Sequence, residues 1–254
     1  QVYGPKNLPS LIYWAWSFLR IYAPTPYGSS RDMYTIAYFG SLSEFQTIKF
    51  FIKYLKYDDI FYDIGANYGF YTLLAQEFIK EGQIHAFEPL PEVFEILEMN
   101  VKPQDFKNTF LNQVAVSDVV GEIEFFSCKG DSSRSSMIKR DLFGGSHVIK
   151  VKTITLDEYI KTHKPPTIMK IDIEGAEYLA LKGGENLLKS HSPLIIMETL
   201  GDDIIDASLR LNATNFLKDL GYKPYSLLSN GDLEETNYDI FINMKGGHNY
   251  VFIK

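Results

Sequence analysis

The sequence predicts an α/β fold with a mostly parallel sheet, helices on both faces, an antiparallel edge and an N-terminal helical extension. Short apolar runs alternate with stretches of helical periodicity between about residues 60 and 220. Such alternation produces parallel strands joined by helices. The last apolar runs, at residues 238–244 and 249–253, have no helix between them, which indicates the antiparallel edge. We therefore expect one α/β domain over residues 43–254, preceded by an extension of helix and strand over residues 1–42.

The individual elements follow in chain order. A strand at 33–39 and a helix at 43–55 are expected ahead of the first strand–helix unit. Five buried strands are then expected at 61–64, 83–87, 108–116, 167–173 and 193–199. The helices that connect or follow them are expected at 69–80, 91–101, 175–189 and 206–220. The runs at 121–126 and 147–154 predict antiparallel strands around a polar loop, and a short helix at 155–160 has Thr155 or Asp157 as its cap. The tail, at 222–229, 238–244 and 249–253, is strand-like.

Composition excludes several classes of protein. The 254 residues include 17 Tyr and 18 Phe, enough for a large core, and carry a net charge of −7 without a basic stripe. Nucleic acid is therefore not expected as a partner. The single cysteine, Cys128, cannot form an intrachain disulfide, and no Cys/His ligand spacing is present. We predict no metal site, although carboxylates from several strands could hold Mg²⁺.

The segment "LPSLIYWAWSFLRIYAP" is the stretch that most resembles a targeting sequence. Its apolar run is shorter than a membrane span and is interrupted by Arg20 and Pro24. We expect a helix that packs its tryptophans on the domain. Contact with a membrane surface or with a second copy of the chain is the alternative. The predicted location is cytoplasmic, with membrane association as the corresponding alternative.

The stretch "DDIFYDIGANYGFYTLLAQ" raises the question of what its turn holds. Ligands of such sheets bind beyond the carboxyl ends of the strands. Asp63 ends the first strand, and Glu88 ends the next, where a carboxylate can accept hydrogen bonds from two ribose hydroxyls. Capping of the helix behind Pro91 is the alternative for Glu88. A dinucleotide needs the spacing Gly-x-Gly-x-x-Gly, but Ala66 and Asn67 stand in this turn, and Asp63 would repel a pyrophosphate. S-adenosylmethionine (SAM) carries an ammonium, a sulfonium and a ribose, so the acids favour SAM over NAD.

A second group of acids follows the later strands. Asp172 and Glu198 stand at the expected ends of two strands, so they should line the same crevice as Asp63. Acids in proximity are costly unless a cation or a shared proton relieves them. Glu174 and Glu177 lie at the start of a helix, where capping is the alternative role. For Asp172 the alternative is an ion pair with Lys170.

These motifs together resemble the FkbM family of SAM-dependent methyltransferases. The resemblance covers roughly Glu44 to the C-terminus and is carried, in order, by "DIGANYGFYT", "AFEPLPEVFEIL", "NQVAVSD", "TLDEYI", "MKIDIEGAEYLALKG", "PLIIMET" and "NYVFI". It implies a Rossmann-like, seven-stranded class I methyltransferase fold. It also implies O-methylation of a hydroxyl on a sugar, glycolipid or other hydroxylated small molecule. The matching cofactor-binding positions are Glu44, Asp63, Gly65, Ala66, Asn67, Gly69, Phe70, Tyr71, Thr72, Glu88, Pro89, Ala115, Val116 and Asp172.

The reaction needs a group that takes the proton of the acceptor hydroxyl. Glu198 is the first choice because its strand should end in the crevice. Asp172, His147 and His248 are the alternatives. For the acceptor we expect a lid at Ser132–Gly145, and the predicted substrate-binding residues are Arg134, Ser135, Ser136, Glu174 and His147. A dinucleotide-dependent oxidoreductase and a non-catalytic SAM-fold binding module are the rival functions.

Overall fold

The computed structural model describes residues 42–102, 107–128, 136–138, 146–201 and 204–254. The expected strand at 33–39, the N-terminal helix and most of the 1–42 extension lie outside the described residues. The first described element is α3 (Leu42–Tyr54), which is the helix expected at 43–55.

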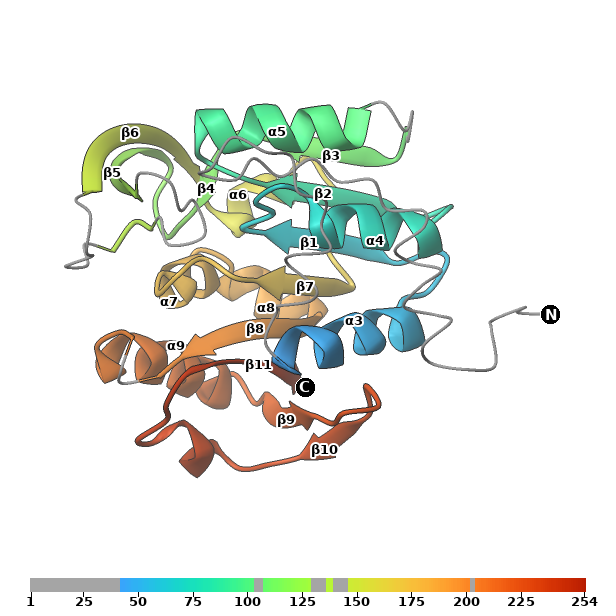
Figure 1. The fold of residues 1–254 in the computed structure, drawn as a ribbon, viewed down its shortest axis with the longest axis vertical. Coiled ribbons are helices and arrows are strands. Elements are labelled where there is room, and N and C mark those ends of the chain that lie inside the picture. The colour runs from blue at the N-terminus through green and yellow to red at the C-terminus, as the bar shows by residue number, and fades with distance from the viewer. Residues whose placement is uncertain (1–41, 103–106, 129–135, 139–145, 202–203) are drawn as a thin grey trace.

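The strands expected from the alternating pattern form a single large sheet in the order β10-β9-β11-β8-β7-β1-β2-β3 (Figure 1). Its parallel part is made of β1 (Ile60–Ile64), β2 (Gln83–Phe87), β3 (Thr109–Asn112), β7 (Ile168–Ile171) and β8 (Leu194–Leu200). Strand β11 (Gly247–Ile253) runs antiparallel between β8 and β9 (Lys223–Leu227). Seven of these strands give the expected sheet with its antiparallel edge, and the short β10 (Leu233–Glu235) adds an eighth strand beside β9.

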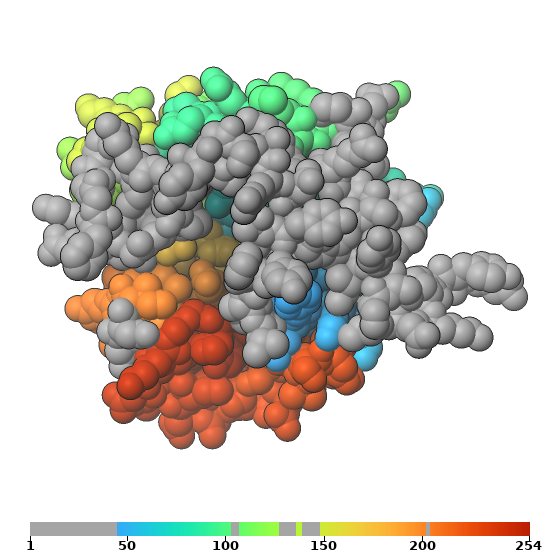
Figure 2. Space-filling model, in the orientation of Figure 1, coloured from blue at the N-terminus to red at the C-terminus, as the bar shows by residue number. Residues whose placement is uncertain are grey.

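Helices cover both faces because successive strand residues point to opposite sides. Phe61 of β1 packs in a cluster with residues of α3 and α4 (Phe70–Phe78), and α5 (Pro91–Val101) packs beside α4. The next residue, Tyr62, packs in the cluster on the opposite face. That face is covered by α6 (Leu156–Tyr159), α7 (Glu177–Lys182), α8 (Glu185–His191) and α9 (Ala207–Asp219). In the space-filling view, α5 and the C-terminal strands lie at opposite ends of the molecule (Figure 2).

A second, three-stranded sheet stands beyond the carboxyl ends of β1 and β2 (Figure 1). It has the order β4-β6-β5, with β4 (Ala115–Val116) parallel to β6 (Ser146–Ile154) and β5 (Gly121–Cys128) antiparallel to it. These are the antiparallel strands predicted at 121–126 and 147–154. Thr155 caps α6, since its side chain accepts a hydrogen bond from Glu158 N. The small sheet places side chains next to the edge at which ligands are expected.

Three predicted elements are wrong. The strand expected at 108–116 is divided between the two sheets, as β3 and β4. The helix expected at 175–189 is interrupted at Gly183 and Gly184, where a Cβ would lie 2.0 Å from Ser117 O and 2.9 Å from Leu156 Cδ1 respectively. At 238–244 a 3₁₀ helix, η3 (Tyr238–Phe241), and a turn replace the expected strand, so the antiparallel partners of β11 are β8 and β9. Arg210 Nε donates to Phe241 O at 2.9 Å, which gives that carbonyl a partner outside a sheet. Among the described residues, no helix is long and apolar enough to cross a membrane.

Candidate active site

The turn after β1 is bound to both neighbouring strands. Gly65 N and Ala66 N each donate to Phe87 O at 3.0 Å, which ties the turn to the end of β2. On the other side, a Cβ at Gly65 would lie 2.0 Å from Asp172 O, and the φ of Gly65 is +84°. Only glycine adopts this backbone conformation readily and leaves room for that carbonyl. The turn is therefore fixed between the ends of β2 and β7.

Glu88 joins this turn to the start of α5. Its carboxylate accepts hydrogen bonds from Asn67 N at 3.1 Å and from Leu90 N at 2.9 Å. Leu90 is the N-cap residue of α5. Glu88 therefore both supports the start of α5 and lies beside the turn. Glu88 is 6% exposed, and burial raises its pKa to about 7 against the lowering effect of these two hydrogen bonds. The carboxyl group therefore changes protonation near neutral pH.

A cavity of about 320 Å³ opens at this edge of the sheet. Its walls come from the β1 turn, the end of β2, the β3–β4 connection, the small sheet, and the ends of β7 and β8. The lining residues are Ile64, Gly65, Asn67, Phe87, Glu88, Pro89, Leu90, Val114, Ala115, Val116, Phe125, Met137, Asp172, Ile173, Glu174 and Glu198. This volume falls at the lower end of the range of small-molecule sites.

Half of the predicted cofactor positions line this cavity, namely Gly65, Asn67, Glu88, Pro89, Ala115, Val116 and Asp172. Ala66, Gly69, Phe70, Tyr71 and Thr72 build the turn and the first turns of α4. Asp63 is buried under the turn and accepts a hydrogen bond from Thr72 Oγ1 at 2.6 Å. Glu44 lies in α3, with its side chain outside the described residues.

Sequence reasoning missed the apolar wall of the cavity. Phe125 reaches it from β5 and Met137 from the described residues between β5 and β6, while Leu90 and Val114 complete it. Alternation of polar and apolar residues in "GEIEFF" marks Phe125 as inward-facing. No sequence signal places β5 over the ends of β1 and β2.

SAM fits the residues that are present. Asn67 Oδ1 is buried and has no hydrogen-bond partner among the described residues, so it is left for a ligand. Glu88 supplies an acceptor for the ribose hydroxyl groups of SAM, and Leu90, Val116 and Phe125 supply an apolar surface for its adenine ring. The acids at the other end of the cavity suit a cationic ligand.

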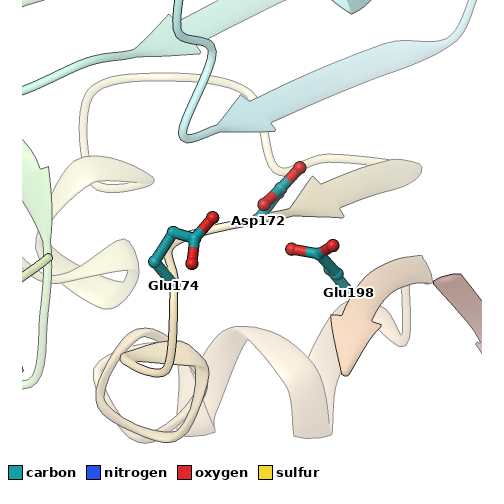
Figure 3. Close-up of side chains that lie close together, drawn as sticks. All are labelled: Asp172, Glu174 and Glu198. Carbon is teal, nitrogen blue, oxygen red and sulfur yellow. The ribbon is translucent and has the colours of Figure 1, made fainter. Parts of the chain in front are cut away.

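Three carboxylates meet at that end. The side chains of Asp172, Glu174 and Glu198 point toward one another, the first two from the segment after β7 and the third from β8 (Figure 3). One oxygen of each lies within 4.8 Å of the others. Glu198 was expected at the end of its strand. It lies two residues before that end, because β8 continues to Leu200 in its pairing with β11. It does lie just past Met197, where the pairing with β7 stops.

Asp172 and Glu198 share a hydrogen bond and oppose each other electrostatically. The charge of Asp172, and then burial, raise the pKa of Glu198 well above its ordinary value. Burial also acts to raise the pKa of Asp172, but the charge of Lys170 and the hydrogen bonds from Glu198 and Lys170 lower it overall. Lys170 Nζ lies 2.6 Å from Asp172 Oδ2, which is the ion pair that was the alternative reading of Asp172. The pKa values of the two carboxyls are therefore shifted in opposite directions, that of Glu198 upward and that of Asp172 downward.

The acids next to this pair have different partners. Glu177 Oε1 accepts from Gly175 N at 3.0 Å and from Ile173 N at 3.3 Å, which agrees with the capping role. Glu174 has a φ of +59°, a strained conformation for a residue with a side chain. A spacing of 4.8 Å between carboxylates would also admit a cation. Exposed acids commonly lie this close without one, so the prediction that no metal is bound remains a prediction.

The predicted acceptor-binding residues are only partly described. Arg134 and Ser135 lie outside the described residues, as does the side chain of His147. Ser136 is buried, and its hydroxyl donates to Glu174 O at 2.9 Å and accepts from Ile138 N at 3.1 Å. His248 is exposed, with Nε2 3.2 Å from Lys245 O. Ser136 therefore supports the loop that carries Glu174.

Two curated proteins resemble the chain over about half to two thirds of its length. Hexuronic acid methyltransferase AglP of Haloferax volcanii is 26% identical over 171 residues, which cover 66% of this chain and 68% of AglP. Methyltransferase sdnD of Sordaria araneosa is 24% identical over 151 residues, which cover 48% of this chain and 58% of sdnD.

A solved structure shares the fold. The crystal structure of methyltransferase FkbM from Methylobacillus flagellatus aligns with a TM-score of 0.52 and 15% identity, over 83% of this chain and 48% of that protein. This chain thus spans about half the length of that protein. The model of the methyltransferase FkbM domain matches residues 63–224, which include the turn, Glu88 and the acidic cluster. The chain therefore belongs to the FkbM methyltransferase family, whose methyl donor is S-adenosylmethionine.

Proposed function

We propose that this methyltransferase transfers a methyl group from SAM to a hydroxyl group of a sugar or another hydroxylated small molecule. The observation that carries the proposal is the Asp172–Glu198 pair, which opens into the same cavity as Glu88. A hydroxyl is a weak nucleophile until a base removes its proton. The pair offers such a base next to the site of the donor.

The residues of the cavity divide the work between binding and proton transfer. Glu88 and Asn67 would hold polar groups of the donor at one end, and Phe125 and Met137 would cover it with an apolar wall. When bound, SAM supplies an electrophilic methyl group attached to a sulfonium. Glu198, in its ionised form, accepts the proton of the acceptor hydroxyl, and its raised pKa makes it a stronger base. Asp172 stays ionised beside it and stabilises the proton that Glu198 receives.

A sugar acceptor is supported by AglP, which is described as a hexuronic acid methyltransferase. The rival functions lack comparable support. A dinucleotide-dependent oxidoreductase does not agree with membership of a methyltransferase family, and a non-catalytic binding module would have no use for a half-buried pair of acids with opposed pKa shifts. We retain residues 43–254 as the transferase domain and a cytoplasmic location as predictions. The predicted membrane or dimer contact of the N-terminal segment falls on residues outside those that the structure describes.

The test is a product assay with SAM labelled with ¹³C in its methyl group and a panel of neutral hexoses, hexuronic acids and oligosaccharides. The proposal predicts a ¹³C signal of a methyl ether on a sugar carbon. A methyl ester on a hexuronate, or methylation at nitrogen or carbon, would contradict it. The role of the pair in this assay is tested with Glu198→Gln. Its matched control is Glu95→Gln, which makes the same change at an exposed glutamate of α5.

A further inference from the structure

Lys170 is a buried cation in the middle of the sheet. Its side chain is 2% exposed, and it is among the largest fully buried side chains of the described residues. A buried ammonium is costly unless it is paired. Lys170 Nζ lies 2.6 Å from Asp172 Oδ2 and 4.6 Å from the centre of the Tyr71 ring. The lysine is therefore held between α4 and the end of its own strand.

Several acids face this ammonium from the strands around it. Asp63 of β1 is the direct strand partner of Lys170; burial raises the pKa of Asp63, and the charge of the lysine opposes this rise. Asp172 follows Lys170 by two residues, just after the end of β7, and the charge of Lys170 also lowers the pKa of Glu198 of β8 against its overall rise. Glu174 and Glu177 add negative charge near the Asp172–Glu198 pair. Lys170 thus lies among several acids, and its charge acts most strongly on Asp172, which it contacts directly.

We propose that Lys170 is a positioning residue for methyl transfer, which holds Asp172 in its ionised form through Oδ2, so that a proton taken up by the Asp172–Glu198 pair goes to Glu198. This inference rests on the proposed role of Glu198 as the base. The basis is geometric, because Lys170 Nζ lies 2.6 Å from Asp172 Oδ2, and Asp172 and Glu198 both line the cavity. A cation in contact with one of two coupled carboxyls favours ionisation of that carboxyl.

The position of the proton has a chemical consequence. With Asp172 held ionised, its charge raises the pKa of Glu198, which makes Glu198 a stronger base. Without Lys170, both carboxyls should hold protons more tightly, and the two would share them more evenly. The purely structural alternative is that Lys170 only offsets the buried charge of Asp63, with no effect on the pair.

The experiment follows the carboxyl groups directly, by ¹³C NMR titration of protein labelled at the Asp and Glu side-chain carboxyls. Asp172→Asn and Glu198→Gln assign the two signals by their loss. Lys170→Met is compared with the wild type, and Lys170→Arg restores a cation at the same place. Lys182→Met, which breaks the Lys182–Asp118 ion pair of 2.8 Å away from the cavity, is the matched control.

The proposal predicts that the Asp172 signal titrates at higher pH in Lys170→Met, by about one pH unit or more, the usual size of an ion-pair effect. In Lys170→Arg the midpoint should return toward the wild-type value, and in Lys182→Met it should not move. An Asp172 midpoint that is the same in wild type and folded Lys170→Met would overturn the proposal. If Lys170→Met does not fold, the variant Lys170→Met/Asp63→Asn removes one buried acid together with the cation. A raised Asp172 midpoint in that variant would then support the proposal, and an unchanged midpoint would overturn it.

A kinetic measurement separates this inference from the proposed function. With an acceptor found by the panel assay, Lys170→Met should lower kcat at neutral pH by about tenfold or more and move the rising limb of kcat to higher pH. The affinity for SAM should not fall, because the site becomes more negative. The NMR titration needs no acceptor. A shifted Asp172 midpoint without any hydroxyl methylation would therefore uphold the role of Lys170 in the pair and reject the role of Glu198 as the base.

Discussion

Among single residues, Glu88 is the group whose protonation should depend most on the cofactor. Its pKa of about 7 in the unliganded protein means that it is partly protonated at neutral pH. Ribose hydroxyls donate hydrogen bonds and thus favour the ionised form. We expect the affinity for SAM to rise as pH increases from about 6 to 8, with release of a proton on binding. Calorimetric titration in buffers of different ionisation enthalpy measures both quantities.

Glu88→Gln is the variant that checks this prediction. It should weaken SAM binding by about 1.5–3 kcal/mol, the scale of a hydrogen bond to a charged group, and should remove most of the pH dependence. Glu95→Gln on the exposed face of α5 should change neither. A pH-independent affinity in the wild type, or an unchanged affinity in Glu88→Gln, would mean that Glu88 serves only the N-cap of α5.

Glu198 supplies the second prediction for a single residue. Glu198→Gln keeps the shape of the side chain and its contact with Asp172, but it cannot take a proton. We expect kcat to fall by about 10²–10⁴-fold, the usual range for general base catalysis, while SAM affinity stays close to that of the wild type. Single-turnover methyl transfer by folded Glu198→Gln at nearly the wild-type rate would pass the role to Asp172 or a histidine.

The turn between β1 and α4 is the element whose geometry allows the sharpest test. Gly65→Ala would strain a backbone at φ +84° and drive its Cβ to 2.0 Å from Asp172 O. Gly221→Ala is the matched control, because Gly221 has a similar φ of +87° and its Cβ would meet nothing nearer than 3.8 Å. We expect both variants to lower Tm, and Gly65→Ala alone to abolish measurable SAM binding. Equal losses of stability with intact binding in both would show that the close contact at Gly65 does not hold the site.

Elements with strong local patterns could be predicted from the sequence, and elements set by distant contacts could not. The parallel strands follow from buried apolar runs, so Glu88 and Asp172 could be assigned to one edge of the sheet. The break after α7 depends on Ser117 and Leu156, which approach the two glycines from other parts of the chain. The 3₁₀ helix η3 similarly depends on Arg210. Contacts of this kind leave no periodicity in the segment itself.

The same limit applies to the candidate site. Glu198 was placed in the crevice from its strand, but the pairing of β8 with β11 beyond Met197 was not foreseen. The burial of Lys170 between Asp63 and Tyr71 required the register of β1 and β7 and the position of α4. The predicted lid at Ser132–Gly145 lies mostly outside the described residues and remains a prediction. Within it, the structure describes Ser136 bound to the backbone of Glu174.

For the whole molecule, the buried acids predict how stability depends on pH. Glu88 and Glu177 have pKa values raised to about 7 in the folded protein, mainly by burial, whereas unfolded glutamates titrate near pH 4. The folded state therefore binds more protons between these values. The stabilising contribution is complete below the unfolded pKa and is lost as pH rises through about 7. Asp172, with a lowered pKa, acts in the opposite sense only at lower pH.

We accordingly expect the unliganded protein to have a higher Tm at about pH 5.5 than at pH 8. The expected difference in unfolding free energy is a few kcal/mol, given about 1.4 kcal/mol for each unit by which a pKa differs between the two states. Glu177→Gln should reduce this dependence, and scanning fluorimetry across the pH range measures it. A Tm that increases from pH 5.5 to pH 8 would show that these carboxyls are ionised in the folded protein.

The position of the donor relative to the acids is the central claim, and a crystal structure of the complex with S-adenosylhomocysteine tests it most directly. The account predicts that the ribose hydroxyls lie within hydrogen-bond distance of Glu88. It also predicts that the adenine ring lies against Leu90, Val116 and Phe125, and that the sulfur faces the Asp172–Glu198 pair. A complex with the ligand outside this cavity, or with its sulfur turned away from the pair, would contradict both the assignment of the site and the role of Glu198.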